Sequence, residues 1–188
     1  MTATGPARPM RADARRNCER IIEVARTVFR EDGVDAPLDE IVKRAKIGAG
    51  TLYRHFPTRD TLIEQVYRAE IVGLSDRAYQ LAKKFPPEQA LTEWIREQVR
   101  WVLGQHGLAA SLKAVIDHDS EVFQLCRTAL RDAADALLKP LQDSGKVRAD
   151  VASAELLRLC HALAIAIENQ PEEQAELMIS IMLRGLRP

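Results

Sequence analysis

Apolar residues recur at intervals of three and four along most of the 188-residue chain, a spacing that predicts helices rather than strands. In residues 14–31, for example, Ile21, Ala25 and Val28 share one helical face, and Gly33 supplies a stop signal. No strict alternation typical of a β-strand competes with this spacing. The pattern therefore predicts an all-α protein.

Glycine and proline divide the rest of the chain into further expected helices. Together with the first helix they give about nine, over residues 38–45, 49–55, 58–83, 88–103, 108–117, 120–142, 152–168 and 172–185.

The helices expected over residues 38–45 and 49–55 are short, follow a longer helix and are joined by a three-residue turn. Such elements form a helix-turn-helix, in which the second short helix enters the major groove of DNA. The sequence thus predicts three parts: a flexible basic arm over 1–13, a helix-turn-helix DNA-binding domain over 14–60, and a helical domain over 61–188.

The second short helix begins with residues that have almost no side chain, Gly48, Ala49 and Gly50. Small residues let a helix N-terminus approach a phosphate closely and direct backbone N–H groups at it. Leu52 and Phe56, four residues apart, are expected to form the buried underside of this helix.

Four polar residues are then left to point outward as candidate DNA contacts: Thr51, Tyr53, Arg54 and His55. Tyr53 could equally be a core aromatic, and Arg54 and His55 could be solvated surface. Thr58 is expected to cap the next helix. Arg59, in its first turn, is a further candidate for a phosphate contact.

Charge and composition narrow the class of protein. Residues 1–60 hold 12 Lys and Arg against 9 Asp and Glu, so the N-terminal third is the part more suited to a polyanion. No run of eighteen apolar residues and no secretory signal occurs, which predicts a cytoplasmic protein without a membrane partner. The three cysteines are expected to be reduced thiols that pack as small apolar residues.

The runs LDEIV, from residue 38, and AKIGAGTLYRHFPTRDTL, from residue 45, resemble the N-terminal DNA-binding domain of the TetR family of bacterial transcriptional regulators. The resemblance spans about residues 15–67. It implies a homodimer whose recognition helices contact the two halves of a palindromic operator. It also implies an all-α C-terminal domain that dimerises and binds a small effector.

By position in this motif, Thr51, Tyr53 and His55 match the usual phosphate or groove contacts, Arg54 a base-reading position and Arg59 the customary lysine of the next helix. Lys46 replaces a usual glycine where the backbone is often left-handed, and is a candidate phosphate contact. The expected DNA-binding residues are Lys46, Ala49, Gly50, Thr51, Tyr53, Arg54, His55 and Arg59.

The later helices carry aromatic and polar residues that the resemblance would gather around an effector cavity. The candidates are Trp94, Trp101, Val115, His118, Phe123, Cys126 and His161, each of which could instead be plain core. Residues 117–121 combine imidazole and carboxylates, but adjacent side chains on one turn diverge, so a helix cap is favoured over a metal site. Neither a metal nor a cofactor is expected.

The last two expected helices have broad apolar faces, which suit a four-helix bundle between two subunits. The candidate dimer residues are Leu156, Cys160, Leu163, Ile167, Met178, Ile181 and Met182. The alternative is that one face of each helix only closes the core of its own subunit.

Two other classes of function compete with DNA binding. Catalysis is disfavoured because Cys160 and His161 diverge by about 100° around a helix, and no phosphate-binding or zinc motif occurs. A helical protein-binding adaptor would explain the apolar bundle but not the glycine-led polar helix at 49–55. The sequence therefore predicts a DNA-binding regulator, a homodimeric repressor released by a small-molecule effector, with a ligand-independent or activating regulator as an alternative.

Overall fold

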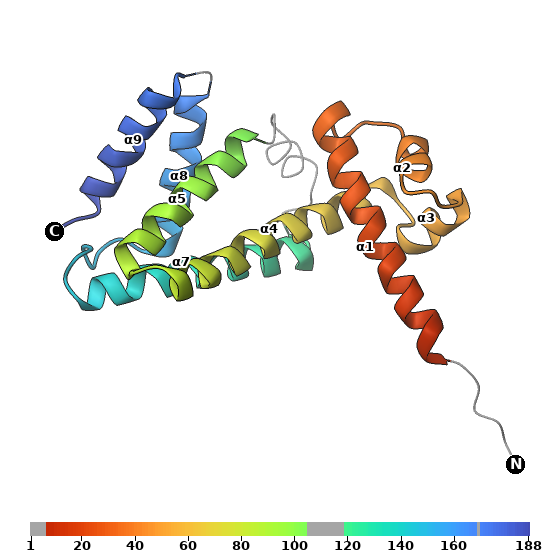
Figure 1. Ribbon diagram of the computed structural model, residues 1–188, viewed down its shortest axis with the longest axis horizontal. Helices are drawn as coiled ribbons and strands as arrows, with labels where there is room; N and C mark the ends of the chain where they lie inside the picture. Colours follow the sequence, from red (N-terminus) through yellow and green to blue (C-terminus); the bar gives the residue numbers. More distant parts are fainter. Residues whose placement is uncertain (1–6, 105–118, 169) are drawn as a thin grey trace, which may run out of the picture. The chain divides into compact units, whose positions relative to one another are not determined.

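A computed structural model describes residues 7–104, 119–168 and 170–188, which form eight α-helices and no β-strand (Figure 1). The helix expected over 108–117 lies outside the described residues. The chain divides into two compact units, residues 1–67 and 68–188. The division falls inside α4 (Arg59–Lys84), whereas the sequence pattern placed it at residue 60.

The first unit contains α1 (Ala7–Asp32), α2 (Leu38–Arg44), α3 (Ala49–His55) and the start of α4. α1 begins at Ala7, although the sequence favoured an arm as far as residue 13. The alanines and arginines of this segment are good helix formers, and a helix tolerates the single proline in its first turn. α1 ends as expected at Gly33, which has a φ of 84° and donates its N–H to the Phe29 carbonyl at 3.1 Å.

The core of the first unit draws buried apolar side chains from all four helices, and α2 packs against both α1 and α3. Its buried members include Ile21, Ala25, Val28, Phe29, Ile41, Leu52, Phe56, Leu62, Ile63 and Val66. The expected cap of α4 is present, because the Thr61 N–H donates to Thr58 Oγ1 at 3.2 Å. Thr58 N–H donates to Thr61 Oγ1 in return, also at 3.2 Å.

The second unit contains the rest of α4, α5 (Pro87–Gly104), α7 (Glu121–Asp143), α8 (Ser153–Ile167) and α9 (Glu172–Gly185). α8 packs against both α5 and α7, and α9 lies along α8 and α5 (Figure 1). Trp94 is fully buried in the shared core of these helices. Among the described residues, no helix has both the length and the apolar character needed to span a bilayer.

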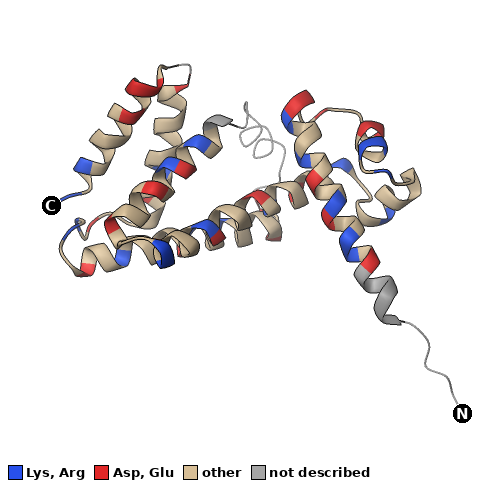
Figure 2. Cartoon of the chain, in the orientation of Figure 1, with Lys and Arg blue, Asp and Glu red and all other residues tan. Residues whose placement is uncertain are grey.

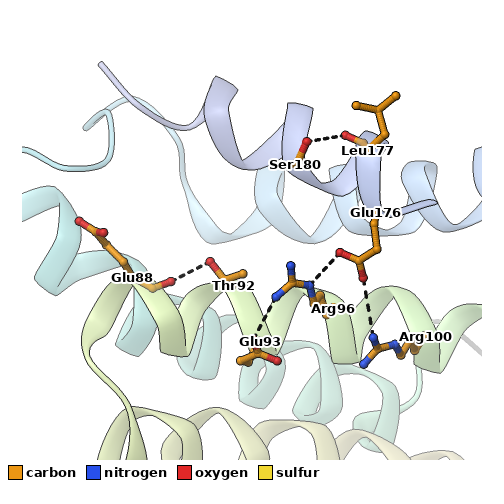
Figure 3. A network of polar contacts seen from close by, with 8 residues as sticks. All are labelled: Glu88, Thr92, Glu93, Arg96, Arg100, Glu176, Leu177 and Ser180. Atoms are coloured by element: carbon orange, nitrogen blue, oxygen red, sulfur yellow. Dashed lines mark hydrogen bonds and ion pairs between the residues drawn. The ribbon is translucent and has the colours of Figure 1, made fainter. Parts of the chain in front are cut away.

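Ion pairs fix α9 against α5 at the edge of this core (Figure 3). A carboxylate oxygen of Glu176 lies 3.1 Å from Arg96 Nε, and its other oxygen lies 3.7 Å from Arg100 Nη2. Arg96 also pairs with Glu93 at 3.0 Å. Because Glu176 belongs to α9 and both arginines belong to α5, the network fixes the position of α9 along α5.

Candidate nucleic-acid interface

The turn between α2 and α3 depends on one residue with an unusual backbone. Lys46 has a φ of 52°, the left-handed conformation expected from the sequence. The N–H of Ile47 then donates to the Val42 carbonyl at 3.2 Å and closes the end of α2. Gly48 follows in an extended conformation as the N-cap of α3, which begins at Ala49.

α3 has a buried side and a polar side, as the sequence pattern predicts. Leu52 and Phe56 are buried. The Tyr53 side chain is 50% exposed, so its ring is not a core aromatic. Arg54 is also exposed, while Thr51 and His55 are half-buried. A short helix thus presents a tyrosine and an arginine to solvent on a well-packed support.

The glycines of α3 have no structural explanation within the described part of the chain. Gly48 has a φ of −80°, and Gly50 is not among the residues with positive φ. A Cβ atom added at either position would meet no atom within 4 Å. Neither backbone strain nor packing within the described chain therefore requires glycine here. Without side chains at these two positions, the backbone at the start of α3 is accessible to a partner.

Arg59 has partners that the sequence did not reveal. Its Nη1 donates to the backbone carbonyls of Val34 at 2.7 Å and Ala36 at 2.8 Å. Both carbonyls belong to the loop between α1 and α2, so Arg59 braces that loop against the start of α4. Long-range contacts of this kind have no local sequence signal.

A second arginine, Arg44, holds α2 in place. It donates to Glu40 on its own helix at 2.7 Å and to Glu31 on α1. These hydrogen bonds raise the pKa of the Arg44 guanidinium and lower the pKa of Glu40. α1 and α2 carry charged residues of both signs (Figure 2).

The expected effector residues of the second unit are only partly brought together. Trp94, Phe123 and Cys126 are buried, and Trp101 is half-buried, whereas His161 is exposed. Val115 and His118 lie outside the described residues. The Trp94 Nε1–H donates to the Leu74 carbonyl at 3.0 Å, and the Trp101 Nε1–H donates to Glu70 Oε2 at 2.7 Å.

The expected dimer residues separate onto two faces of α8 and α9. Leu156, Cys160 and Ile167 are buried in the core of their own unit, so they are not available to a partner. This corrects the expectation for these three and matches the alternative that one face closes the core. Leu163, Met178 and Met182 are half-buried, and Ile181 is 58% exposed.

The outer face contains three further large apolar residues. Leu159, Ile165 and Leu177 are large, apolar and exposed. A groove of about 540 Å³ runs between α8 and α9, and its lining includes Leu159, Leu163, Met178 and Ile181. Residues 177–183 of α9 carry no charge, and the charged residues of α9 lie towards its ends (Figure 2).

The cysteines and the start of α7 were the other candidate chemical features of the sequence. All three cysteines are free thiols, and burial raises the pKa of Cys160 to about 12, so this thiol stays neutral. Ser120 caps α7 by accepting from the Phe123 N–H at 3.2 Å, which confirms the cap expected at 117–121. No cluster of metal-binding side chains occurs within the described ranges.

Three helices and the start of a fourth, with a short helix that presents polar side chains to solvent, form the arrangement of a helix-turn-helix protein. Two sequence families match the chain. Residues 21–66 match "Bacterial regulatory proteins, tetR family", and residues 86–188 match "Transcriptional regulator SbtR-like, C-terminal domain". The chain belongs to the TetR family and is a DNA-binding transcriptional regulator.

Solved structures agree with this assignment. The chain is 34% identical to the TetR regulator SCO0520 from Streptomyces coelicolor, over 91% of this chain and 98% of that one, with a TM-score of 0.72. A TetR regulator from Mycobacterium vanbaalenii is also 34% identical, over 96% of this chain and all of that one, again with a TM-score of 0.72. RolR, solved with resorcinol, has the same fold at 22% identity and a TM-score of 0.64, over 93% of this chain and 89% of that one.

Curated relatives match the chain over a shorter stretch. An HTH-type transcriptional regulator of Staphylococcus aureus (strain USA300) is 41% identical over 63 residues, which is 33% of this chain. The match spans about a third of the length of that relative.

Proposed function

We propose that the protein is a homodimeric repressor that binds a palindromic operator through α3 and is released by a small-molecule effector. The observation that carries this proposal is the surface of α3, where exposed polar side chains stand beside glycines that the fold does not need. Glycines at these positions would allow a nucleic-acid backbone to approach the start of α3 closely. Such a role would place the protein in the cytoplasm.

Each exposed residue of α3 has a distinct part in this proposal. Arg54, with its planar guanidinium, reads a base edge in the major groove. Thr51, Tyr53 and His55 donate to phosphates or line the groove, and these contacts set the register of the helix. Ala49, Gly50 and Lys46 belong to the same surface, with the Lys46 ammonium beside a phosphate.

Arg59 has a more limited part. Since its Nη1 already donates to two backbone carbonyls, we assign it the bracing of the α1–α2 loop. Any phosphate contact would use the rest of its guanidinium.

Dimerisation is proposed through the outer face of α8 and α9. The exposed residues Leu159, Ile165, Leu177 and Ile181, together with the apolar groove between α8 and α9, give these helices an outer surface that a second copy could cover. Two copies of this face would bury it in a four-helix bundle. A dimer also provides the two recognition helices, about 34–36 Å apart, that successive major grooves require.

The effector site is proposed in the second unit, near the tryptophans of α5. The buried aromatic and polar groups there suit a small molecule, and RolR shows that the fold can hold one. The effector would bind in a different unit from the one that binds DNA. We therefore propose that effector binding lowers the affinity for the operator rather than raising it. The alternatives of an activator or a ligand-independent regulator predict that no ligand weakens operator binding.

The test begins with genomic fragments captured by the native protein, from which the operator sequence is derived. Operator binding is then measured by fluorescence anisotropy for Arg54→Ala and for Arg127→Ala, an exposed arginine of α7 used as the control. We expect Arg54→Ala to weaken binding by about 1–3 kcal/mol, roughly five- to 150-fold, and to relax base preference at one position of each half-site. Arg127→Ala should bind like the native protein.

A protein-binding adaptor predicts a different outcome. If Tyr53→Ala and Arg54→Ala together left operator affinity unchanged, α3 would not be the reading helix and the proposal would fail.

A further inference from the structure

Most of the buried polar residues of the described chain are gathered on two helices. The buried polar or charged residues are Glu70, Ser75, Gln98 and Ser153, and the first three lie on α4 and α5. The interior of a protein disfavours such groups unless they have hydrogen-bond partners. A concentration of them next to aromatic side chains therefore needs an explanation.

Two tryptophan side chains place Gln98 between α4 and α5. Trp94, Gln98 and Trp101 occupy positions i, i+4 and i+7 of α5, which lie on one helical face. The indoles on either side of Gln98 both donate to α4, Trp94 to the Leu74 carbonyl at 3.0 Å and Trp101 to Glu70 Oε2 at 2.7 Å. Gln98 therefore faces α4, about 4.5 Å along the helix axis from Trp101.

The amide of Gln98 is the anomaly in this interface. Its side chain is only 4% exposed, and its Nε2 has no hydrogen-bond partner among the residues that the structure describes. Nearby polar groups are satisfied: both indoles have acceptors, and the Ser75 hydroxyl donates to the Ile71 carbonyl at 2.9 Å. An amide that offers two donors to a dry interior is costly, and a missing acceptor is the simplest reason to retain it.

The carboxyl group of Glu70 limits which kind of ligand can supply the acceptor for Gln98. Its side chain is only 5% exposed, and one of its oxygens accepts from Trp101. A ligand that reaches Gln98 enters beside this acidic group, so an anionic ligand is disfavoured by repulsion between like charges. A hydroxyl group fits both residues, because its oxygen can accept from the Gln98 amide while its hydrogen is donated to Glu70.

We infer that Gln98 and Glu70 form the polar end of the effector site, and that the effector is an uncharged, mainly apolar molecule with a hydroxyl group. This inference rests on the proposed function for the existence of an effector. The body of the ligand would lie against apolar groups of α4 and α7. Cys126 on α7 is close enough to α4 for the charge of Arg68 to oppose the rise in its pKa that burial causes.

Three small molecules that share a phenylbutyl group but differ in their polar group test which polar group the site prefers. They are 4-phenyl-1-butanol, 4-phenylbutylamine and 4-phenylbutyrate, which carry a hydroxyl, an ammonium and a carboxylate at neutral pH. The only tryptophans of the chain are Trp94 and Trp101, so intrinsic fluorescence reports directly on this interface. We expect a saturable change with the alcohol, a weaker affinity for the amine, and none with the carboxylate at the same concentration.

Two variants connect the signal with the two residues. Gln98→Leu should weaken binding of the alcohol at least tenfold while raising the melting temperature, because a buried unpaired amide is removed. Glu70→Gln should let the carboxylate bind. Gln89→Leu, on the exposed surface of α5, is the control and should bind all three molecules like the native protein.

Several outcomes would overturn the inference. They are no fluorescence change with the alcohol, equal binding of alcohol and carboxylate by the native protein, or undiminished alcohol binding by Gln98→Leu. The titration contains no DNA, so its result is independent of operator binding. If the alcohol bound as expected but did not release the operator, the polar site would stand and the proposed release mechanism would fail.

Discussion

Gly50 lies in the first turn of α3, where glycine makes a helix less stable than alanine would. The fold gives no reason for it, since an added Cβ would meet open space. Gly73 in α4 has the same open surroundings. Both are exposed helical glycines with open surroundings, and only Gly50 lies on the proposed DNA-binding surface, so Gly73 serves as its comparison.

We predict that Gly50→Ala and Gly73→Ala each stabilise the protein by up to about 1 kcal/mol, because alanine loses less backbone entropy in a helix. Only Gly50→Ala should weaken operator binding, since its methyl group would hold α3 away from the DNA backbone. Chemical denaturation measures the first effect and fluorescence anisotropy the second. Equal operator affinity for both variants would show that close approach at Gly50 is not needed.

Lys46 is the reverse case of Gly50. It has a Cβ atom, yet its backbone is left-handed, a conformation that glycine adopts at lower cost. We predict that Lys46→Gly raises the free energy of unfolding by about 1 kcal/mol. If the ammonium contacts a phosphate, the same change reduces the slope of log affinity against log salt by about one unit. A stabilised variant with an unaltered salt slope would restrict Lys46 to a role in the turn.

At the scale of the helices, hydrogen bonds and ion pairs of single side chains fix how one helix lies along its neighbour. Apolar packing alone would allow the helices to slide. Arg59 ties the start of α4 to the loop before α2, and Glu176 ties α9 to α5 (Figure 3). Both sets of contacts join residues far apart in the sequence. They orient the helices that carry the proposed DNA-binding and dimer surfaces.

We predict that Arg59→Ala destabilises the protein by about 1–2 kcal/mol, since the Val34 and Ala36 carbonyls each lose a charge-assisted donor. Arg59→Lys should recover only part of this loss, because one ammonium matches the guanidinium geometry poorly. Urea denaturation provides the comparison. A variant as stable as the native protein would mean that the brace contributes nothing.

At the scale of the whole molecule, the apolar face of α8 and α9 is the feature with the largest consequence. Its residues are uncharged and exposed, while the opposite sides of the same helices complete the core of the unit. Ile181 on this face and Leu125 on α7 are both 58% exposed, so they offer a comparison at equal exposure.

We predict that Ile181→Glu converts the protein to monomers, because two carboxylates would be buried against apolar surface in each dimer. Leu125→Glu should leave the assembly unchanged. Sedimentation velocity measures the mass, and operator affinity should fall with loss of the dimer. A dimeric Ile181→Glu variant would place the subunit contact elsewhere.

The sequence by itself determined the helical class and most of the helix limits, since these follow from local spacing, glycine and proline. It also determined which side of α3 is buried, because Leu52 and Phe56 are one helical turn apart. The left-handed turn at Lys46 and the cap at Thr58 were likewise predictable, as each depends on neighbouring residues alone.

Only the tertiary structure decided which apolar face of α8 and α9 is used inside the unit. Both faces are apolar in sequence, so periodicity could not separate Cys160, which is buried, from Ile181, which is exposed. It also revealed the acceptors of Arg59 and the missing partner of Gln98. Such pairings depend on residues brought together by folding from distant parts of the chain, and local sequence carries no record of them.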